Sequence, residues 1–239
     1  MLILALDTTT RAGSAAVLRD QTVLHVRSGD PGQTHGQRLP TELMRVLDEA
    51  GVRLDQIELF AVAAGPGSFT GLRVGIATIQ ALALARERRV VPVSVLDALA
   101  RAVTVRPSEE APGEDDYIAA WMDAQRGEVF AALYEQDGRT LVTDPTASPP
   151  EATLESWLPY VRSGASLWFA GDGALRYREL LQGRLAERAR VLDELPALAG
   201  LIGAIASERA EHAVRPHAIV PIYVRRPDAE LARARRARR

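Results

Sequence analysis

The residues best suited to chemistry are three glycines in the first third of the 239-residue chain: Gly65, Gly67 and Gly71. They lie between an apolar run at 59–64, which predicts a strand, and a helical pattern at 72–88. Backbone N–H groups at such a junction can cradle a phosphate, but the spacing is one residue longer than the dinucleotide fingerprint, and the chain has no lysine for a P-loop. The structural alternative, which we favour, is that Pro66 and Gly67 turn the chain. Ser68 or Thr70 would then cap the helix.

Two aspartates could hold a metal ion between them. Asp7 and Asp123 each end an apolar run in corresponding places of the two halves of the chain, and paired carboxylates are suitable ligands for Mg²⁺. The turn after Asp7 reads Thr-Thr-Thr-Arg-Ala, without an early glycine that would let a phosphate approach. The alternative, which we favour, is that each carboxylate accepts backbone N–H groups of its own turn.

A second glycine pair, Gly171 and Gly173, flanks Asp172 just before a helical pattern at 174–188. The carboxylate of Asp172 would repel a phosphate unless a metal intervened. An acid is favourable at a helix N-terminus. We therefore expect Asp172 to cap the helix that follows.

Other chemistries are excluded by composition. The absence of cysteine removes disulfides, thiolate catalysis and Cys-containing zinc sites. The four histidines show no i, i+4 pairing, so we expect no metal site: His25, His35, His212 and His217. The apolar start, residues 2–6, is short and has no basic residue before it, and no run is long enough to span a bilayer. We expect a cytoplasmic protein.

The elements that must position these residues follow from the periodicity of apolar side chains. The first half predicts strands over 2–6, 14–18, 22–26, 59–64 and 90–95, and helices over 36–50 (regular from Pro40), 72–88 and 96–103. The second half predicts strands near 117–122, 129–134 and 167–170, a loop over 144–150, helices over 154–161, 174–188 and 196–212, and an extended segment over 219–224.

Each half starts in the same way, with an apolar strand ending in Asp, a polar turn, a glycine and a returning apolar strand. This weak repeat indicates a duplicated fold. We expect an N-terminal subdomain over 1–105, a C-terminal subdomain over 106–225 and an arginine-rich tail over 226–239. The helix at 196–212 is expected to be able to pack back on the first subdomain.

Four segments together carry a resemblance to a known family: residues 4–8, 64–75 (Ala-Gly-Pro-Gly-Ser-Phe-Thr-Gly-Leu-Arg-Val-Gly), 123–129 (Asp-Ala-Gln-Arg-Gly-Glu-Val) and 221–225 (Pro-Ile-Tyr-Val-Arg). In this order they resemble the bacterial TsaB (YeaZ) family, over nearly the whole chain. That family is the non-catalytic partner of TsaD, a subunit of tRNA threonylcarbamoyladenosine synthase. The resemblance implies an α/β, duplicated RNase-H-like or actin-like (ASKHA) fold. It also implies a supporting role in placing threonylcarbamoyl on the adenosine next to the anticodon.

The resemblance also implies which groups are missing. TsaD carries a His-x-x-x-His metal pair just after the strand that corresponds to 90–93. Alignment by that strand places Val95 and Leu99 there, and neither side chain can bind a metal. The resemblance thus implies an accessory subunit and not an enzyme, with no cofactor of its own. Its cleft would be vestigial, with candidate residues Asp7, Gly67, Asp123, Gly171 and Gly173; the alternative is a small-molecule kinase or ATPase that uses Asp7 and Asp123.

The partners implied by the resemblance are a TsaD-like catalytic subunit, a TsaE-like ATPase, tRNA and a second copy of this chain, with ATP and Mg²⁺ used by the partner subunits. The expected interface lies on the helices at 36–50 and 72–88, through Leu39, Leu43, Leu47, Leu72, Gly75, Ile76, Ile79 and Leu82. The alternative is that the second helix is buried within one chain.

Charge is unevenly distributed along the chain. Residues 225–239 carry seven arginines against two acids, whereas the whole chain has a net charge of −2. Such a tail could contact tRNA phosphates. The alternative, which we favour, is that it is a solvated terminus.

Overall fold

The computed structural model describes residues 1–106 and 111–225. The first half forms a sheet in the order β3-β2-β1-β4-β5, with strands β1 (Leu2–Asp7), β2 (Ser14–Arg19), β3 (Thr22–Ser28), β4 (Leu59–Gly65) and β5 (Arg89–Ser94). Short turns make β1, β2 and β3 antiparallel, whereas β4 and β5 run parallel to β1 because helices connect them. These connecting helices are α1 (His35–Glu49) and α2 (Phe69–Ala85).

The second half repeats this order as β8-β7-β6-β9-β10. Its strands are β6 (Tyr117–Asp123), β7 (Val129–Glu135), β8 (Leu141–Ser148), β9 (Leu167–Ala170) and β10 (Ala189–Val191), and its helices are α4 (Pro150–Trp157), α5 (Asp172–Arg176) and α6 (Arg178–Leu185). Again the first three strands are antiparallel and the last two run parallel to the first of them. The repeated topology confirms the duplicated RNase-H-like, actin-like α/β fold that the resemblance implied.

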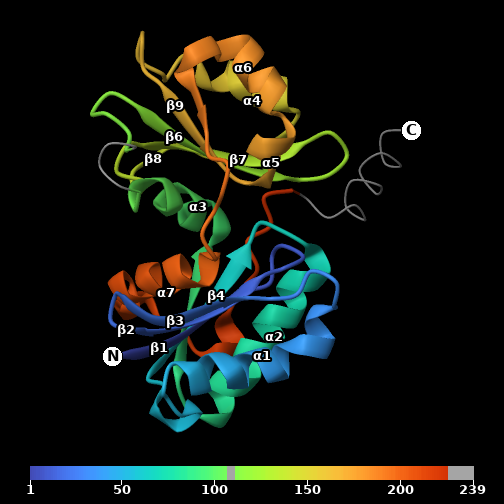
Figure 1. Cartoon of the computed structure of the whole chain (residues 1–239), viewed down its shortest axis with the longest axis vertical. Coiled ribbons are helices and arrows are strands. Elements are labelled where there is room, and N and C mark those ends of the chain that lie inside the picture. The colour runs from blue at the N-terminus through green and yellow to red at the C-terminus, as the bar shows by residue number, and fades with distance from the viewer. Residues whose placement is uncertain (107–110, 226–239) are drawn as a thin grey trace.

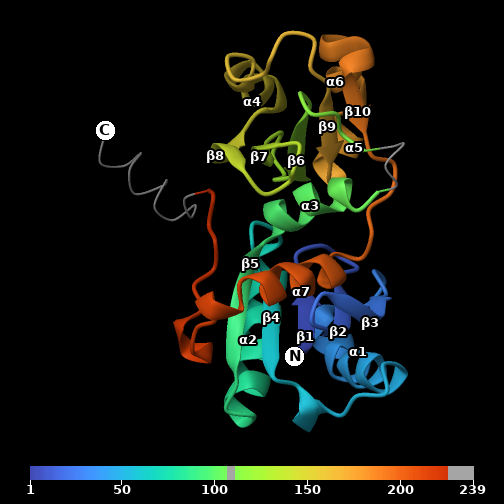
Figure 2. The same ribbon diagram turned by 90° about the vertical axis from the view of Figure 1, so that its left-hand side faces the viewer.

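Two helices, α3 (Val95–Thr104) and α7 (Leu198–Glu208), lie between the two sheets (Figures 1 and 2). The outer face of the first sheet is covered by α1 and α2, and that of the second sheet by α4, α5 and α6. The buried cluster between the sheets draws side chains from both sheets and from both central helices. The two halves therefore share one hydrophobic layer.

The chain after β10 returns to the first half. α7 packs on β1 and β2, Val214 forms a bridge with Val90 of β5, and Ile222 N–H donates to the Ala64 carbonyl at 2.7 Å. Residues 198–222 follow the second half in sequence but pack against the first half in space.

Ion pairs fasten the central helices to the second half. Glu208 of α7 accepts hydrogen bonds from Arg101 of α3 at 2.8 and 3.0 Å and from Arg139, after β7, at 2.7 and 2.9 Å. These guanidinium groups lower the pKa of Glu208 to about 2, despite the opposing effect of partial burial. Asp97 of α3 accepts a hydrogen bond from the Tyr134 hydroxyl of β7 at 2.8 Å.

Some elements differ from those predicted. The predicted loop at 144–150 is mostly strand β8, in which Pro145 is tolerated because β8 is an edge strand. The predicted helix at 174–188 is broken at Tyr177 into α5 and α6. α1 begins at His35, well before Pro40, and its start is supported by a hydrogen bond from Thr34 N–H to the Gln37 side chain.

The predicted tail over 226–239 lies outside the described residues. Within the described ranges, no helix is both long and apolar enough to cross a membrane.

Candidate functional site

The candidate residues gather at the ends of β1, β4, β6 and β9. Asp7 ends β1 and is only 3% exposed. One oxygen of its carboxylate accepts hydrogen bonds from the Thr9 N–H at 2.8 Å and the Thr9 hydroxyl at 2.6 Å. Burial raises its pKa, against the lowering effect of these hydrogen bonds. Asp7 thus serves its own turn, as the structural alternative expects.

The glycines after β4 let helix α2 press against this same turn. A Cβ on Gly67 would lie 2.5 Å from Thr9 Cβ, and a Cβ on Gly71 would lie 2.0 Å from the Thr8 carbonyl oxygen. The Thr8 hydroxyl donates to the Gly71 carbonyl at 2.8 Å in a buried position. Ser68 is the N-cap of α2, and its hydroxyl accepts from Gly71 N–H at 3.3 Å. The space that these glycines leave free is therefore filled by the chain itself.

In the second half, glycines also allow a helix to pack closely against the end of a strand. A Cβ on Gly171 would lie 2.0 Å from the Trp121 carbonyl oxygen, and one on Gly173 would lie 2.6 Å from the Met122 carbonyl carbon. These glycines bring the start of α5 against the end of β6. Their absence of side chains serves packing between elements of the fold.

Asp123 is also engaged within the chain. Its carboxylate accepts from Gln125 N–H at 2.9 Å and from Arg176 at 2.6 Å. Asp172 lies in the first turn of α5, where an acid is favourable, but contrary to our expectation it forms no capping hydrogen bond, and Gly171 is the N-cap residue. The Asp172 carboxylate instead accepts from Asp123 N–H at 2.9 Å. Loss of surrounding water, with repulsion from Asp123, raises the pKa of Asp172.

The candidate residues of this cleft make contacts within the chain. The candidate carboxylates already accept hydrogen bonds from the chain, and the candidate glycines already contact backbone or side-chain atoms of neighbouring strands. Across the described ranges there is no cluster of three or more His, Asp or Glu side chains arranged to hold a metal ion.

The positions aligned with the TsaD histidines are part of the core. Val95 and Leu99 begin α3 and are 0% and 2% exposed, inside the layer between the sheets. Substituting a histidine pair there would bury imidazoles among apolar side chains. The fold at this point is built for packing.

The residues predicted for the partner interface lie mostly in this chain's own core, which corrects their assignment. Seven of these eight residues are fully or nearly buried: Leu39, Leu43, Leu47, Leu72, Gly75, Ile76 and Ile79. The eighth, Leu82, is half-buried. Helical periodicity identified an apolar face, and that face covers the first sheet. The large apolar side chains that α1 and α2 leave exposed are Met44, Phe69 and Leu84.

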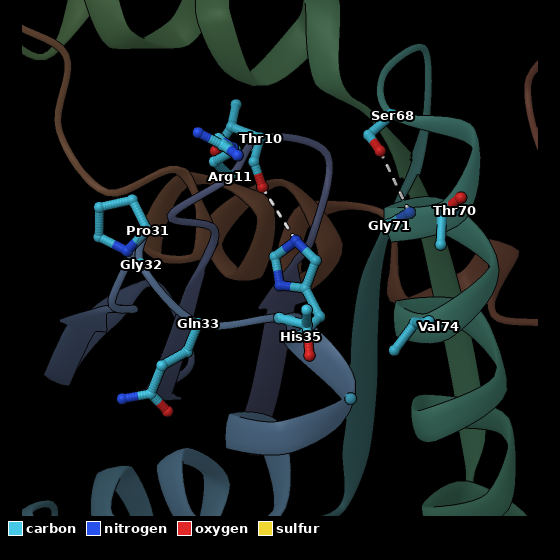
Figure 3. Close-up of a pocket in the computed structure, with 12 residues that line it drawn as sticks. Thr10, Arg11, Pro31, Gly32, Gln33, His35, Ser68, Thr70, Gly71 and Val74 are labelled. Atoms are coloured by element: carbon cyan, nitrogen blue, oxygen red, sulfur yellow. Dashed lines mark hydrogen bonds between the residues drawn. The ribbon is translucent and has the colours of Figure 1, made fainter.

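A pocket of about 310 Å³ opens between the N-termini of α1 and α2 (Figure 3). Its polar lining includes Thr10, Arg11, Thr34, His35, Ser68 and Thr70. The His35 ring lies 3.0 Å from the Thr10 carbonyl through Nε2 and 2.7 Å from Arg38 through Nδ1, so Nε2 donates and Nδ1 accepts. Burial and the adjacent Arg38 lower the pKa of His35. The volume of the pocket is near the lower limit for small-ligand sites.

Sequence reasoning missed an exposed cluster beside this pocket. The Arg73 guanidinium lies 3.9 Å above the Phe69 ring, and the Phe69 and Tyr223 ring centres are 6.2 Å apart. Close by in sequence, Arg225 pairs with Glu128 of the β6–β7 turn. Three of the segments that carried the family resemblance thus meet here. The i, i+4 spacing of Phe69 and Arg73 on one helix was the available signal.

Comparisons with known proteins agree with this architecture. A family model described as TsaD, tRNA N6-adenosine threonylcarbamoyltransferase, matches residues 28–233. The tRNA threonylcarbamoyladenosine biosynthesis protein TsaB of Escherichia coli is 38% identical over 137 residues, which cover 57% of this chain and 56% of that protein. The Bacillus subtilis TsaB is 25% identical over 96% of both chains.

A solved structure, YeaZ from Pseudomonas aeruginosa, superposes with a TM-score of 0.72 at 33% identity and covers 93% of this chain and 99% of its own. The B. subtilis match and this structural match extend over both halves of the fold. The chain therefore belongs to the TsaB (YeaZ) family, within the wider family whose model is described as TsaD.

Proposed function

We propose that this chain is a non-catalytic subunit in the biosynthesis of threonylcarbamoyladenosine in tRNA. It would support transfer of the threonylcarbamoyl group to the adenosine next to the anticodon by binding a TsaD-like catalytic subunit. Relatives in E. coli and B. subtilis are named for this biosynthesis. A role in tRNA modification implies that the protein acts in the cytoplasm.

The observation that supports the non-catalytic assignment is that each candidate catalytic position makes hydrogen bonds or core contacts within the chain. Asp7 and Asp123 accept hydrogen bonds from their own turns, and Val95 and Leu99 are core residues. A kinase or ATPase that uses Asp7 and Asp123 remains the alternative, but it has less support, because both carboxylate oxygens of Asp123 already accept hydrogen bonds from Gln125 or Arg176.

The proposed docking face is the solvent-exposed side of α1 and α2. Its contact residues would be the exposed side chains of these helices, and not the buried residues that the sequence predicted. Met44 is 54% exposed and Leu84 is 69% exposed. On α2, the exposed Ala77 and Ala81 precede Leu84, and small side chains let a partner helix approach closely. ATP and Mg²⁺ would be used by the TsaD-like and TsaE-like subunits, with tRNA joining the assembly. The same face could pair two copies of this chain.

Co-purification with the TsaD-like subunit tests the proposal. Met44→Arg and Leu84→Arg place a charge on the docking face without entering the core, and we expect each to weaken the complex. Leu158→Arg is the matched control, because Leu158 is 52% exposed and directly follows α4, which lies on the second half, away from α1 and α2 (Figure 1). If the chain and TsaD-like subunit fail to co-purify, or if both face variants behave like the control, the proposal is wrong.

A further inference from the structure

The exposed cluster at the start of α2 is unusual for its composition. Phe69 is 51% exposed and Tyr223 is 46% exposed, although large aromatic side chains ordinarily bury most of their surface. The two rings are tilted by 34°, and Arg73 lies over the Phe69 ring. We call these three residues the Phe69 stack. The stack forms a partly exposed aromatic surface, and the guanidinium of Arg73 supplies a positive charge beside it.

Positive charge is concentrated around the Phe69 stack. Arg73 is exposed and has no carboxylate partner within the described part of the chain. Arg11 lines the neighbouring pocket, is also exposed, and likewise lacks an acidic partner among the described residues. The described chain ends at Arg225, two residues after Tyr223, and the sequence that follows, 226–239, holds six arginines and two acids. Arg73 and Arg11, which have no acidic partner among the described residues, offer a local attraction for anions.

We propose that the Phe69 stack is a contact site for a single-stranded loop of RNA, with exposed bases stacking on Phe69 and Tyr223 and phosphates pairing with the surrounding arginines. Proteins read RNA mostly at loops, where unpaired bases stack on aromatic rings or guanidinium planes. Such stacking tolerates any base, and arginine adds cation–π attraction. The inference rests on the proposed function, since the anticodon loop of a tRNA presents unpaired bases near the adenosine to be modified.

The pocket beside the Phe69 stack extends the same surface. Thr70 and Val74 line the pocket, and Phe69 and Arg73 precede them by one residue each, so the two pairs point about 100° apart around α2. An RNA strand that stacks on Phe69 would therefore pass the hydroxyl of Thr70 and the guanidinium of Arg11. This arrangement gives the phosphate backbone donors next to the aromatic surface.

Fluorescence anisotropy with the full-length chain tests the inference. The probes are an unmodified tRNA transcript and a single-stranded uridine 12-mer, each titrated at several salt concentrations. We expect Phe69→Ala and Tyr223→Ala to weaken binding of both probes by about tenfold. Arg73→Ala should reduce the slope of log affinity against log salt by about one. Arg86→Ala, just after the far end of α2, and Tyr160→Ala, an exposed aromatic residue of the second half, should bind like the unchanged chain.

Removing 226–239 should weaken binding further, and the shortened chain should still respond to Phe69→Ala. The inference is overturned if the chain binds neither probe at low salt, or if the three stack variants bind as tightly as the controls. It is also overturned if Phe69→Ala weakens co-purification with the TsaD-like subunit while RNA binding is unchanged, because the stack would then be a protein contact. None of these results depends on Met44→Arg or Leu84→Arg, so failure here leaves the proposed function standing.

Discussion

Alanine substitutions at two glycines of α2 test whether the glycine-rich segment exists for packing. A Cβ at Gly71 would lie 2.0 Å from the Thr8 carbonyl oxygen. Relieving this contact to an ordinary separation requires a movement of about 1.2 Å between α2 and the buried turn after β1. Overpacking of this kind costs about 1–3 kcal/mol. For a chain of this length we expect Gly71→Ala to lower Tm by about 2–4 °C for each kcal/mol, measured by circular dichroism.

Gly75 and Thr8 allow a sharper version of this experiment. A Cβ at Gly75 would lie 2.1 Å from Thr8 Oγ1, which is a side-chain atom, whereas the clash at Gly71 is with the main chain. Thr8→Ala should therefore relieve most of the cost of Gly75→Ala, with a coupling of about 1 kcal/mol or more in a double-mutant cycle. The same change should leave Gly71→Ala clearly destabilising.

Gly183→Ala is the matched control. Gly183 lies in α6, and a Cβ there would meet nothing within 4 Å. We expect this substitution to raise stability by about 0.5–1 kcal/mol through helix propensity alone. The packing argument is refuted if Gly71→Ala behaves like Gly183→Ala, or if Thr8→Ala fails to relieve Gly75→Ala. Glycines kept only for phosphate binding would give that result.

Three further predictions follow from the same structure. The arginines beside Glu208 hold its pKa near 2, below the value near 4.5 of the free carboxyl, so the contribution of Glu208 to stability is full above pH 4.5 and is lost as the pH falls toward 2. Glu208→Gln should therefore lower the free energy of unfolding by about 2 kcal/mol at pH 7 and have little effect near pH 2. An equal loss of stability from Glu179→Gln, at an exposed position, would contradict this expectation. Arg225→Ala removes the ion pair with Glu128, and hydrogen exchange of the β6–β7 turn should become faster; unchanged exchange would show that the pair does not hold the turn. Calorimetry of the isolated chain with Mg–ATP should give no saturable heat, whereas tight binding that Asp7→Ala abolishes would favour the kinase or ATPase alternative.

Local patterns predicted much of the fold. Buried strands such as β1 and β4 are continuous apolar runs, and the strand–Asp–turn–glycine–strand pattern at the start of each half indicated the duplication that the two sheets show. The signals failed where tertiary context decides. β8 contains Pro145 and no fully buried residue, and it is a strand because β7 supplies hydrogen bonds along one side.

The site was less predictable for a related reason. Periodicity shows that a helix has an apolar face, but not what covers that face. Ile76 and Ile79 were assigned to a partner, yet they contact the first sheet. Likewise, the sequence alone could not show whether Gly71 faces a phosphate or Thr8, because the two lie 63 residues apart along the chain. The Phe69 stack depends on a contact between α2 and the C-terminal segment, which no local pattern records.

Reconstitution of tRNA modification tests the central claim most directly. A TsaD-like subunit, a TsaE-like ATPase, ATP, an unmodified tRNA and the threonylcarbamoyl donor would be combined with and without this chain, and threonylcarbamoyladenosine measured after nuclease digestion. We expect that modification requires the chain, and that Asp123→Asn, which keeps an acceptor oxygen for the turn, still supports modification. Equal modification without the chain, or loss of modification by correctly folded Asp123→Asn, would contradict a non-catalytic supporting role.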